Sequence, residues 1–293
     1  MITFASTPKP FIGHIGVIQQ NAIGSWLQMD PKPEVYLFGN EEGVADIAKE
    51  FGVHHVPDIA CNEFGTPMLD SVFSQFEELA DTDVLCYSNC DIILFQDLLP
   101  VIEHVHSTFP QFLFVAECQN MDKKVLIDYM DPNWEQELRR EMAERGTRRV
   151  KASDFFLFTK GMYEKYPPLI LGRAYFDNWI IYEARRLSIP VVNGTGSVSA
   201  IHQNHFYSAV PGETAESHSG SEARMNLEII GSRDRVYWMY DNTHRYRNGK
   251  ICADLFGRLL VRERAQMLKR RIRKCCMVCA RPFKPMLKKL GLL

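Results

Sequence analysis

The sequence predicts an α/β protein in which helices flank a mostly parallel central sheet. Short β-rich runs alternate with helical patterns through the first half of the chain, the order from which parallel sheets are built. One run, 83–87, is apolar almost throughout, as expected for a strand that is covered on both faces. Polar or Pro- and Gly-rich segments follow the strands, and in open parallel sheets ligands bind at such strand ends.

The predicted elements cover most of the chain. Strands are expected at 2–6, 34–38, 53–56, 83–87 and 111–116, and helices at 13–29, 44–51, 66–79 and 100–109. After Glu117 the alternation ends, with helices expected at 133–145 and 178–187, strands at 155–158, 189–192 and 198–201, and a polar loop at 212–220. We therefore divide the chain into a main domain, 1–210, a loop and helical connection, 211–254, and a basic helical C-terminal extension, 255–293.

The composition is that of an ordinary soluble protein, because 46% of the 293 residues are hydrophobic and 24% are charged. No run of about 18 apolar residues is present, so no transmembrane helix is expected. The first residues lack the basic region and cleavage site of a signal peptide, which predicts a cytoplasmic location. The eight cysteines are scattered, so we expect reduced thiols, and Cys276 and Cys279 lack the second pair that a structural zinc site needs.

Charge is distributed unevenly along the chain. Residues 256–293 carry twelve Lys or Arg and one acid, a net of +11, so the rest carries −13 to give the overall −2. Such an extension predicts an anionic partner, and a basic amphipathic helix at 255–276 can lie on the cytoplasmic face of an anionic membrane. A solvated helix packed on the main domain is the alternative. The basic residues lack interleaved aromatics and a binding motif, which argues against nucleic acid.

The strongest chemical pattern follows the apolar strand at 83–87. Asn89 and Asp91 are two residues apart, so in extended geometry their side chains point the same way. Hard oxygen donors in this arrangement can hold Mg²⁺ or Mn²⁺ together with a phosphate. An Asx turn that ends the strand is the alternative. Glycine-rich motifs for dinucleotides or P-loop phosphates are absent, and so are the serine-hydrolase and zinc-protease motifs.

Asn89-Cys90-Asp91 resembles the Asp-x-Asp motif of GT-A glycosyltransferases, in a variant with Asn first. The wider pattern, over about 1–207, resembles a bacterial group of GT-A-like glycosyltransferases through the order and spacing of several short stretches. These are Thr7-Pro8-Lys9-Pro10-Phe11, Gly13-His14-Ile15-Gly16, Phe38-Gly39-Asn40-Glu41-Glu42-Gly43, Asn62-Glu63-Phe64-Gly65-Thr66-Pro67, Asp177-Asn178-Trp179 and His202-Gln203-Asn204-His205. The resemblance implies a GT-A-like (Rossmann-like) fold and a nucleotide-sugar donor.

The resemblance also implies a set of residues that bind the nucleotide sugar. The set comprises Thr7, Pro8, Lys9, Asn40, Glu41, Gly65, Asp70 and Asn89. Those after strand 2–6 would line the base, and those after strand 34–38 would hydrogen-bond the base edge. Gly65 would let the backbone approach the nucleotide, Asp70 would reach ribose or sugar, and Asn89 would touch ribose or metal. The alternatives are turn formation at Gly65 and a solvated helix face at Asp70.

Two carboxylates are the candidate catalytic residues. Asp177 matches the position where inverting GT-A enzymes often place the base that takes a proton from the acceptor hydroxyl. Its alternative role is a helix N-cap. Asp154, just before strand 155–158, is the second candidate and could instead bind the acceptor or the donor sugar.

Asp91 and His202 are the expected metal ligands. The resemblance implies a late histidine that completes the metal shell, and His202, at a strand end, is the first choice, with His205 second. An imidazole is acceptable to Mn²⁺, although oxygen ligands suit this ion better. A hydrogen-bonded loop histidine is the alternative.

The predicted function is metal-assisted transfer of a sugar from a nucleotide-diphosphate donor to a hydroxyl of a saccharide or lipid-linked acceptor, with inversion, in surface-polysaccharide assembly. A sugar-phosphate nucleotidyltransferase is one alternative, although 7–10 matches a triphosphate loop poorly. A non-catalytic nucleotide-binding scaffold is the other. Segment 117–122 lacks the arginines and the Trp-Asp pair of the resembled group, which leaves the sugar open, and Asn89 gives the metal one formal charge less than Asp would.

Overall fold

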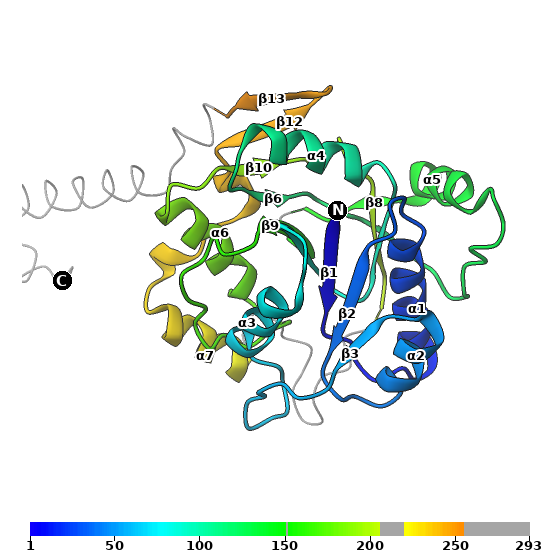
Figure 1. The fold of residues 1–293 in the computed structure, drawn as a ribbon, viewed down its shortest axis with the longest axis horizontal. Helices are drawn as coiled ribbons and strands as arrows, with labels where there is room; N and C mark the ends of the chain where they lie inside the picture. The colour runs from blue at the N-terminus through cyan, green and yellow to red at the C-terminus, as the bar shows by residue number, and fades with distance from the viewer. Residues whose placement is uncertain (151, 206–219, 255–293) are drawn as a thin grey trace, which may run out of the picture.

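A computed structural model describes residues 1–150, 152–205 and 220–254 (Figure 1). The strands of its large sheet are β1 (Ile2–Ser6), β2 (Glu34–Phe38), β3 (His54–Val56), β4 (Val84–Ser88), β6 (Leu113–Val115), β9 (Phe155–Thr159), β10 (Val191–Asn193), β12 (His244–Arg247) and β13 (Lys250–Ala253). The helices are α1 (Gly13–Leu27), α2 (Val44–Phe51), α3 (Leu69–Leu79), α4 (Leu98–Thr108), α5 (Trp134–Arg145), α6 (Phe176–Arg186) and α7 (Ser221–Ile230). Two short 3-10 helices, η1 (Arg233–Arg235) and η2 (Met239–Asp241), follow α7.

The large sheet is mostly parallel. Its described strands lie in the order β13-β12-β10-β6-β9-β4-β1-β2-β3. Only β9, between β4 and β6, and β13, at one edge, run antiparallel to their neighbours in this part of the chain. The carboxyl ends of the other strands therefore lie along one edge, where ligands bind in open α/β sheets. The predicted α/β fold class is confirmed.

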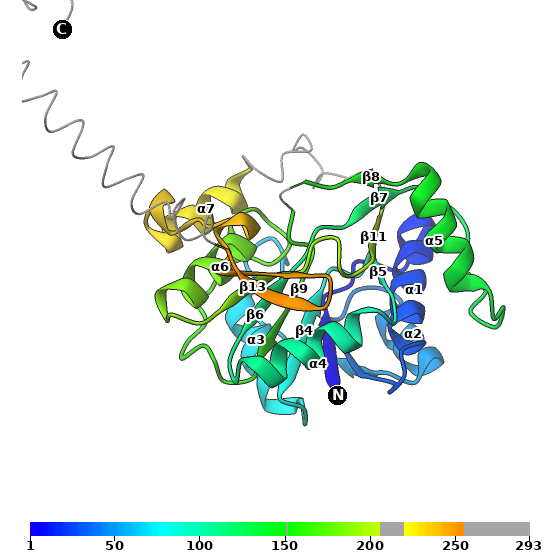
Figure 2. The ribbon, with the colours of Figure 1, turned by 90° about the horizontal axis from the view of Figure 1, so that it is seen from above.

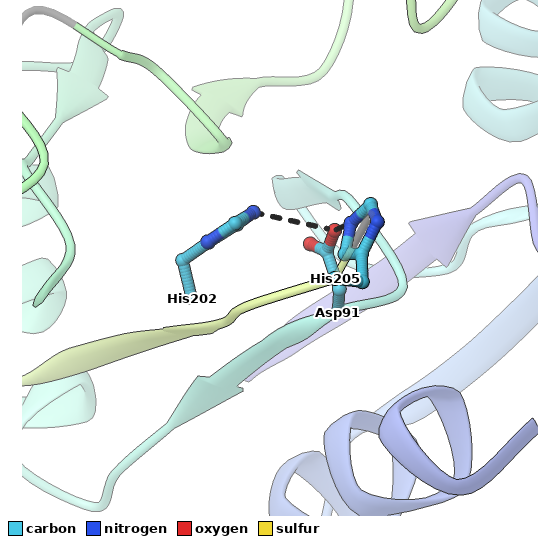
Figure 3. Close-up of side chains that lie close together, drawn as sticks. All are labelled: Asp91, His202 and His205. Atoms are coloured by element: carbon cyan, nitrogen blue, oxygen red, sulfur yellow. Dashed lines mark hydrogen bonds and ion pairs between the residues drawn. The ribbon is translucent and has the colours of Figure 1, made fainter. Parts of the chain in front are cut away.

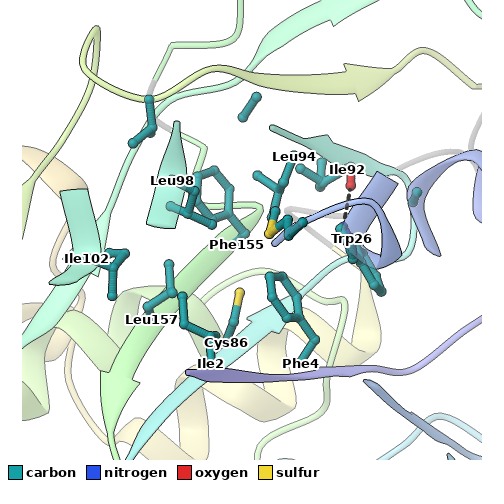
Figure 4. Close-up of a cluster of buried hydrophobic side chains, with 14 of the residues drawn as sticks. Ile2, Phe4, Trp26, Cys86, Ile92, Leu94, Leu98, Ile102, Phe155 and Leu157 are labelled. Carbon is teal, nitrogen blue, oxygen red and sulfur yellow. Dashed lines mark hydrogen bonds between the residues drawn. The ribbon is translucent and has the colours of Figure 1, made fainter. Parts of the chain in front are cut away.

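Helices cover both faces of this sheet. Alternate residues of its central strands point to opposite sides, so the sheet contributes side chains to two cores. Phe4 and Cys86 belong to a core that contains Trp26 of α1 and side chains of α2 and α4 (Figure 4). Tyr87 belongs to a second core with side chains of α3 and α6. The indole N–H of Trp26 donates to the carbonyl of Ile92 at 2.9 Å, so the first core also fixes the chain shortly after β4.

A smaller sheet extends from the end of β4 toward α5. Its strands are β5 (Ile92–Leu94), β7 (Gln119–Met121), β8 (Thr147–Arg148) and β11 (Ala200–Gln203), and their order is β5-β11-β7-β8. Figure 2 shows this sheet beside α5, whose Leu138 packs in a small core with Ile93 and Ile201. The turn that leads from the large sheet into the small one contains Asn89 and Asp91.

The structure differs from the sequence-based expectation in three places. The helix expected from residue 66 begins at Leu69, because Pro67 pairs with Cys61 in an isolated β-bridge. The small sheet was not predicted, since β7 and β8 are only three and two residues long and mostly polar. The β12–β13 hairpin, within the predicted connection 211–254, extends the large sheet.

The predicted division of the chain remains a prediction. The loop expected at 212–220 lies, apart from Gly220, outside the described residues, and so does the basic helical extension with its proposed membrane contact, from residue 255 onward. Among the helices that the structure describes, none has the length and apolar character needed to cross a bilayer.

Candidate functional site

A cavity of ≈ 290 Å³ lies at the carboxyl ends of β1 and β4. Its lining comes from the loop after β1, from α1, from the loop before α3, from the β4–β5 turn and from the segment before α6. Six of the predicted nucleotide-sugar residues line it: Thr7, Pro8, Lys9, Glu41, Gly65 and Asn89. We call this the first cavity.

The loop after β1 is held in position by neighbouring polar side chains. Gln19 of α1 accepts a hydrogen bond from the amide of Lys9 at 2.6 Å and donates one to its carbonyl at 2.8 Å. The hydroxyl groups of Thr7 and Tyr87 lie 2.7 Å apart. Because both backbone groups of Lys9 are satisfied by one buried amide, the loop has a defined place beside β4.

The β4–β5 segment carries Asn89 and Asp91 in a turn rather than in extended geometry. The amide of Ile92 donates to the carbonyl of Asn89 at 3.3 Å and closes this turn. The two predicted side chains consequently have different neighbours. Asn89 lies 3.5 Å from Asp154, whereas Asp91 approaches two histidines. The extended geometry expected at this strand end is therefore wrong, although both residues line the first cavity.

Asp91 faces His202 and His205, one at the end of β11 and one just beyond it (Figure 3). The Nε2 atom of His205 lies 2.8 Å from Oδ2 of Asp91, and that of His202 lies 3.6 Å away. One potential ligand atom from each residue falls within 4.8 Å of the others. The register of β11 with β5 explains the arrangement, because it places His202 opposite Ile92, next to Asp91.

The cluster contains buried polar atoms that have no hydrogen-bond partner among the described residues: Oδ1 of Asp91 and both ring nitrogens of His202. Desolvation lowers the pKa of His202, which favours its neutral imidazole, although the charge of Asp91 opposes this shift. Desolvation would raise the pKa of Asp91, but His205, His202 and Lys9 together lower it. Neutral imidazole and ionised carboxylate are the states that metal binding requires, and unpaired buried atoms of this kind fit a divalent cation.

A second cavity, of ≈ 400 Å³, shares Asn89, Gly172 and Arg173 with the first. Its other described lining residues come from 149–150 and 152–154, from the start of α6 and the residues just before it, and from the segment before η2. Asp154 and Asp177, the two predicted catalytic carboxylates, both line it. The structure thus places both carboxylates beside the cavity that adjoins the first one.

Asp177 is the second residue of α6, and Tyr175, with a φ of 84°, occupies the N-cap position. The N-cap role considered for Asp177 is therefore not the one it has. The pKa of Asp177 is raised to about 7, mainly by desolvation and also by the charge of Asp154, while backbone amides at the helix N-terminus oppose the rise. A carboxyl group with a pKa near 7 is matched to proton transfer at neutral pH.

Asp154 is buried and already engaged by a cation. Arg149 donates to both of its oxygens, from Nε at 2.6 Å and from Nη2 at 3.1 Å. The backbone carbonyl of Asp154 also accepts a hydrogen bond from the amide of Asn89 at 2.9 Å. Asp154 therefore links Arg149 to the β4–β5 turn, whereas Asp177 has a carboxyl group whose pKa lies near 7.

Arg173, which no sequence pattern singled out, lines both cavities. Its Nε donates to Oε2 of Glu222, a buried residue of α7. The other oxygen of Glu222 accepts from Nδ2 of Asn62 at 2.7 Å, so one carboxylate holds both Arg173 and the loop before α3. Since these partners lie far apart in the chain, no local pattern could have identified them.

The same guanidinium acts on Lys9 across the first cavity. Desolvation lowers the pKa of Lys9; the charge of Arg173 lowers it further, while the carboxylate of Asp91 raises it. Two cations and the Asp91 cluster therefore act on the same space, which is the electrostatic setting that binds an anion together with a metal ion.

The remaining predicted residues lie elsewhere. Asn40 is exposed at the end of β2, and Asp70 is half-buried in the first turn of α3; neither lines the described part of the two cavities.

Gly65, which lines the first cavity, has a φ of 79°, and a Cβ added there would meet nothing within 4 Å, so its backbone conformation explains the glycine. Segment 117–122 also contributes nothing to either lining; Glu117 instead binds Arg148.

No protein-family model matches the chain, and no curated protein matches its sequence. Similar solved structures do exist. A mycobacterial protein is 13% identical, with a TM-score of 0.50 over 80% of this chain and 74% of that one. The glucosyl-3-phosphoglycerate synthase of Mycobacterium tuberculosis, solved with Mn²⁺, UDP and glucosyl-3-phosphoglycerate, is 12% identical, with a TM-score of 0.46 over 78% of each chain. The first likeness shows a shared fold.

Proposed function

We propose that this protein is a metal-assisted glycosyltransferase that moves a sugar from a nucleotide-diphosphate donor to a hydroxyl of a saccharide or lipid-linked acceptor. The observation that carries the proposal is the cluster of Asp91, His202 and His205, whose unpartnered buried atoms suit a divalent cation. The cluster borders a cavity that Lys9 and Arg173 also line. Phosphate oxygens are attracted to such a combination of cations.

The sequence resemblance supports a nucleotide sugar as the anion. The residues proposed to bind it are the six that line the first cavity, and Asn40 and Asp70 are proposed only from the resemblance. Thr7 and Pro8 would lie against the base, while Lys9 and Arg173 would bind the diphosphate. The second cavity, next to Asn89 and Arg173, would then receive the acceptor.

Asp91, His202 and His205 would hold Mn²⁺ or Mg²⁺, and the ion, when bound, would neutralise the charge that develops on the departing diphosphate. Asp177 would accept the proton of the acceptor hydroxyl while that oxygen attacks the anomeric carbon. Attack from the side opposite the leaving group inverts the configuration at this carbon. Arg149 would hold the Asp154 side chain in place through its bonds to both carboxylate oxygens.

Isothermal titration with UDP and GDP, with and without Mn²⁺, tests the proposal together with a hydrolysis screen across nucleotide sugars. We expect one diphosphate to bind more tightly with Mn²⁺ and at least one nucleotide sugar to be hydrolysed slowly. Asp81→Ala, an exposed acid outside both linings, is the matched control for variants of Asp91.

The same experiments separate the alternatives. Metal-dependent binding without turnover of any donor would favour a scaffold. Release of pyrophosphate from a nucleoside triphosphate and a sugar phosphate would favour a nucleotidyltransferase. Absence of any nucleotide binding, in the presence of Mn²⁺ as well, would contradict the proposal.

A further inference from the structure

The second cavity has an aromatic wall that the resemblance does not account for. Trp238, immediately before η2, and Tyr175, immediately before α6, both line it and are both half-buried. Trp238 lies beyond the stretch that resembles other glycosyltransferases. Indole and phenol side chains combine a flat apolar face with a polar edge, so they pack against ligands that are apolar on one side and polar at the rim.

Tyr175 holds an unusual backbone conformation at this wall. Its φ of 84° lies in the left-handed region, which a residue with a bulky side chain rarely adopts. Such conformations persist where the surrounding structure enforces them, and they cluster at ligand sites. The turn 172–175 connects the shared wall of the two cavities to α6, so this conformation sets where Tyr175 and Asp177 stand around the second cavity.

The charges around the second cavity are already matched by protein groups. Arg149 binds both oxygens of Asp154, and Arg173 binds the buried Glu222. Among the described lining residues, Arg149 and Arg173 are therefore cations with carboxylate partners, and Asp154 and Asp177 are the carboxylates. Arg173 is assigned to the donor diphosphate, so within the described lining a phosphorylated or carboxylated acceptor would meet Arg149, already bonded to both oxygens of Asp154, and the two acids, which is unfavourable.

We infer that the second cavity binds an uncharged sugar ring, which places its apolar C–H face on Trp238 and its hydroxyl groups toward Asp154 and Asp177. A pyranose has one face of C–H groups and a rim of hydroxyls, which matches a cavity lined by both aromatic side chains and carboxylates. The ≈ 400 Å³ volume lies within the range of small-molecule sites, about 300–1,000 Å³. This inference rests on the proposed function and narrows its acceptor to a neutral saccharide.

Groups that line the two cavities would account for every bond that forms or breaks in the resulting sugar transfer. The acceptor hydroxyl loses its proton to Asp177 and forms a bond from its oxygen to the anomeric carbon of the donor. The bond between that carbon and the phosphate oxygen breaks, and the nucleoside diphosphate leaves with the electron pair. Trp238 touches only the acceptor ring in this scheme, so it determines acceptor binding.

Saturation-transfer NMR on the full chain, with UDP and Mg²⁺ present, tests the inference directly. The probes are methyl α- and β-glucopyranoside and methyl β-galactopyranoside as neutral rings, and glucose 6-phosphate and glucuronate as anionic ones. We expect signals from at least one neutral glycoside and none from the anionic sugars. Trp238→Leu should lose the neutral signal, and Trp238→Phe, which keeps an aromatic face, should retain it.

Trp134→Leu is the matched control, because Trp134 lies on α5, outside the described lining of this cavity. Thermal unfolding of each variant checks that the fold is intact, and Trp238→Phe keeps the test valid if the leucine variant unfolds. Unchanged neutral signals in Trp238→Leu, no neutral signal in the native protein, or stronger signals from the anionic sugars would each overturn the inference. UDP titration on the same samples reports separately on the donor site, so failure of the proposed function is distinguishable.

Discussion

The two cavities share a wall at Asn89 and Arg173, but the chain builds them in different ways. Much of the first comes from segments that directly follow parallel strands, such as Lys9 after β1. The second is assembled from Asp154, Asp177 and Trp238, which belong to distant segments. A general rule about strand ends anticipates the first kind of site. The second kind depends on tertiary packing that no local pattern specifies.

If the first cavity holds the metal and the diphosphate, Asp91→Ala should greatly reduce turnover. Removing the carboxylate takes away one of the three clustered ligand groups, and turnover should fall by at least about 10²–10³-fold, as when a group that stabilises developing charge is deleted. Donor hydrolysis by purified protein measures this. Asp81→Ala should hydrolyse the donor as fast as the native protein does. Native-like activity in Asp91→Ala would contradict the assignment of Asp91 as a metal ligand.

Asp177→Asn tests the second cavity in the same way. Loss of a general base typically lowers turnover by about 10²–10⁴-fold, whereas UDP binding in the first cavity should stay nearly unchanged. Steady-state transfer rates measure the effect on turnover, and UDP titration measures the effect on donor binding. Weakened UDP binding would instead show that Asp177 supports the structure of both cavities.

The pH dependence of the native protein provides a further check on Asp177. Its pKa is raised to about 7, so the carboxylate is available as a base only above that pH, and transfer should rise as pH increases through about 7. In the unfolded chain the Asp177 side chain would lose its proton at a lower pH than in the folded protein. This group therefore makes the free energy of unfolding decrease as the pH rises from about 4 to about 7. Asp177→Asn should remove that decline in thermal midpoint, and an identical decline in the variant would contradict the assigned pKa.

Glu222→Gln tests whether the shared wall couples the two cavities. Glu222 holds Arg173 by an ion pair and Asn62 by a hydrogen bond, so the neutral side chain should release the guanidinium. We expect a loss of about 1–3 kcal/mol in stability and weaker binding of both UDP and acceptor. Glu228→Gln on the same helix is the control. An effect confined to one ligand would mean that Arg173 serves only that cavity.

The sequence predicted the parallel core and much of the first cavity because these depend on short-range patterns. Apolar runs such as 83–87 identified strands, and Asp91 and His202, which the structure brings together, were both found at strand ends. It missed the β5–β11 pairing, which places His202 beside Asp91, because that ladder joins segments about a hundred residues apart. Arg173 was missed for the same reason, since its significance depends on Glu222 of α7.

The smallest expected effect concerns the choice of metal. Two imidazoles and one carboxylate suit Mn²⁺ better than Mg²⁺, which strongly prefers oxygen ligands, so Mn²⁺ should support roughly tenfold higher turnover at equal concentration. Replacing His202 by Asp exchanges a nitrogen ligand for oxygen and should narrow this ratio, whereas His104→Asp, on α4, should leave it unchanged. Turnover measured across a series of both ions gives the ratio for each protein. Higher activity of the native protein with Mg²⁺ would mean that at least one histidine only orients Asp91, as its hydrogen bond to His205 already allows.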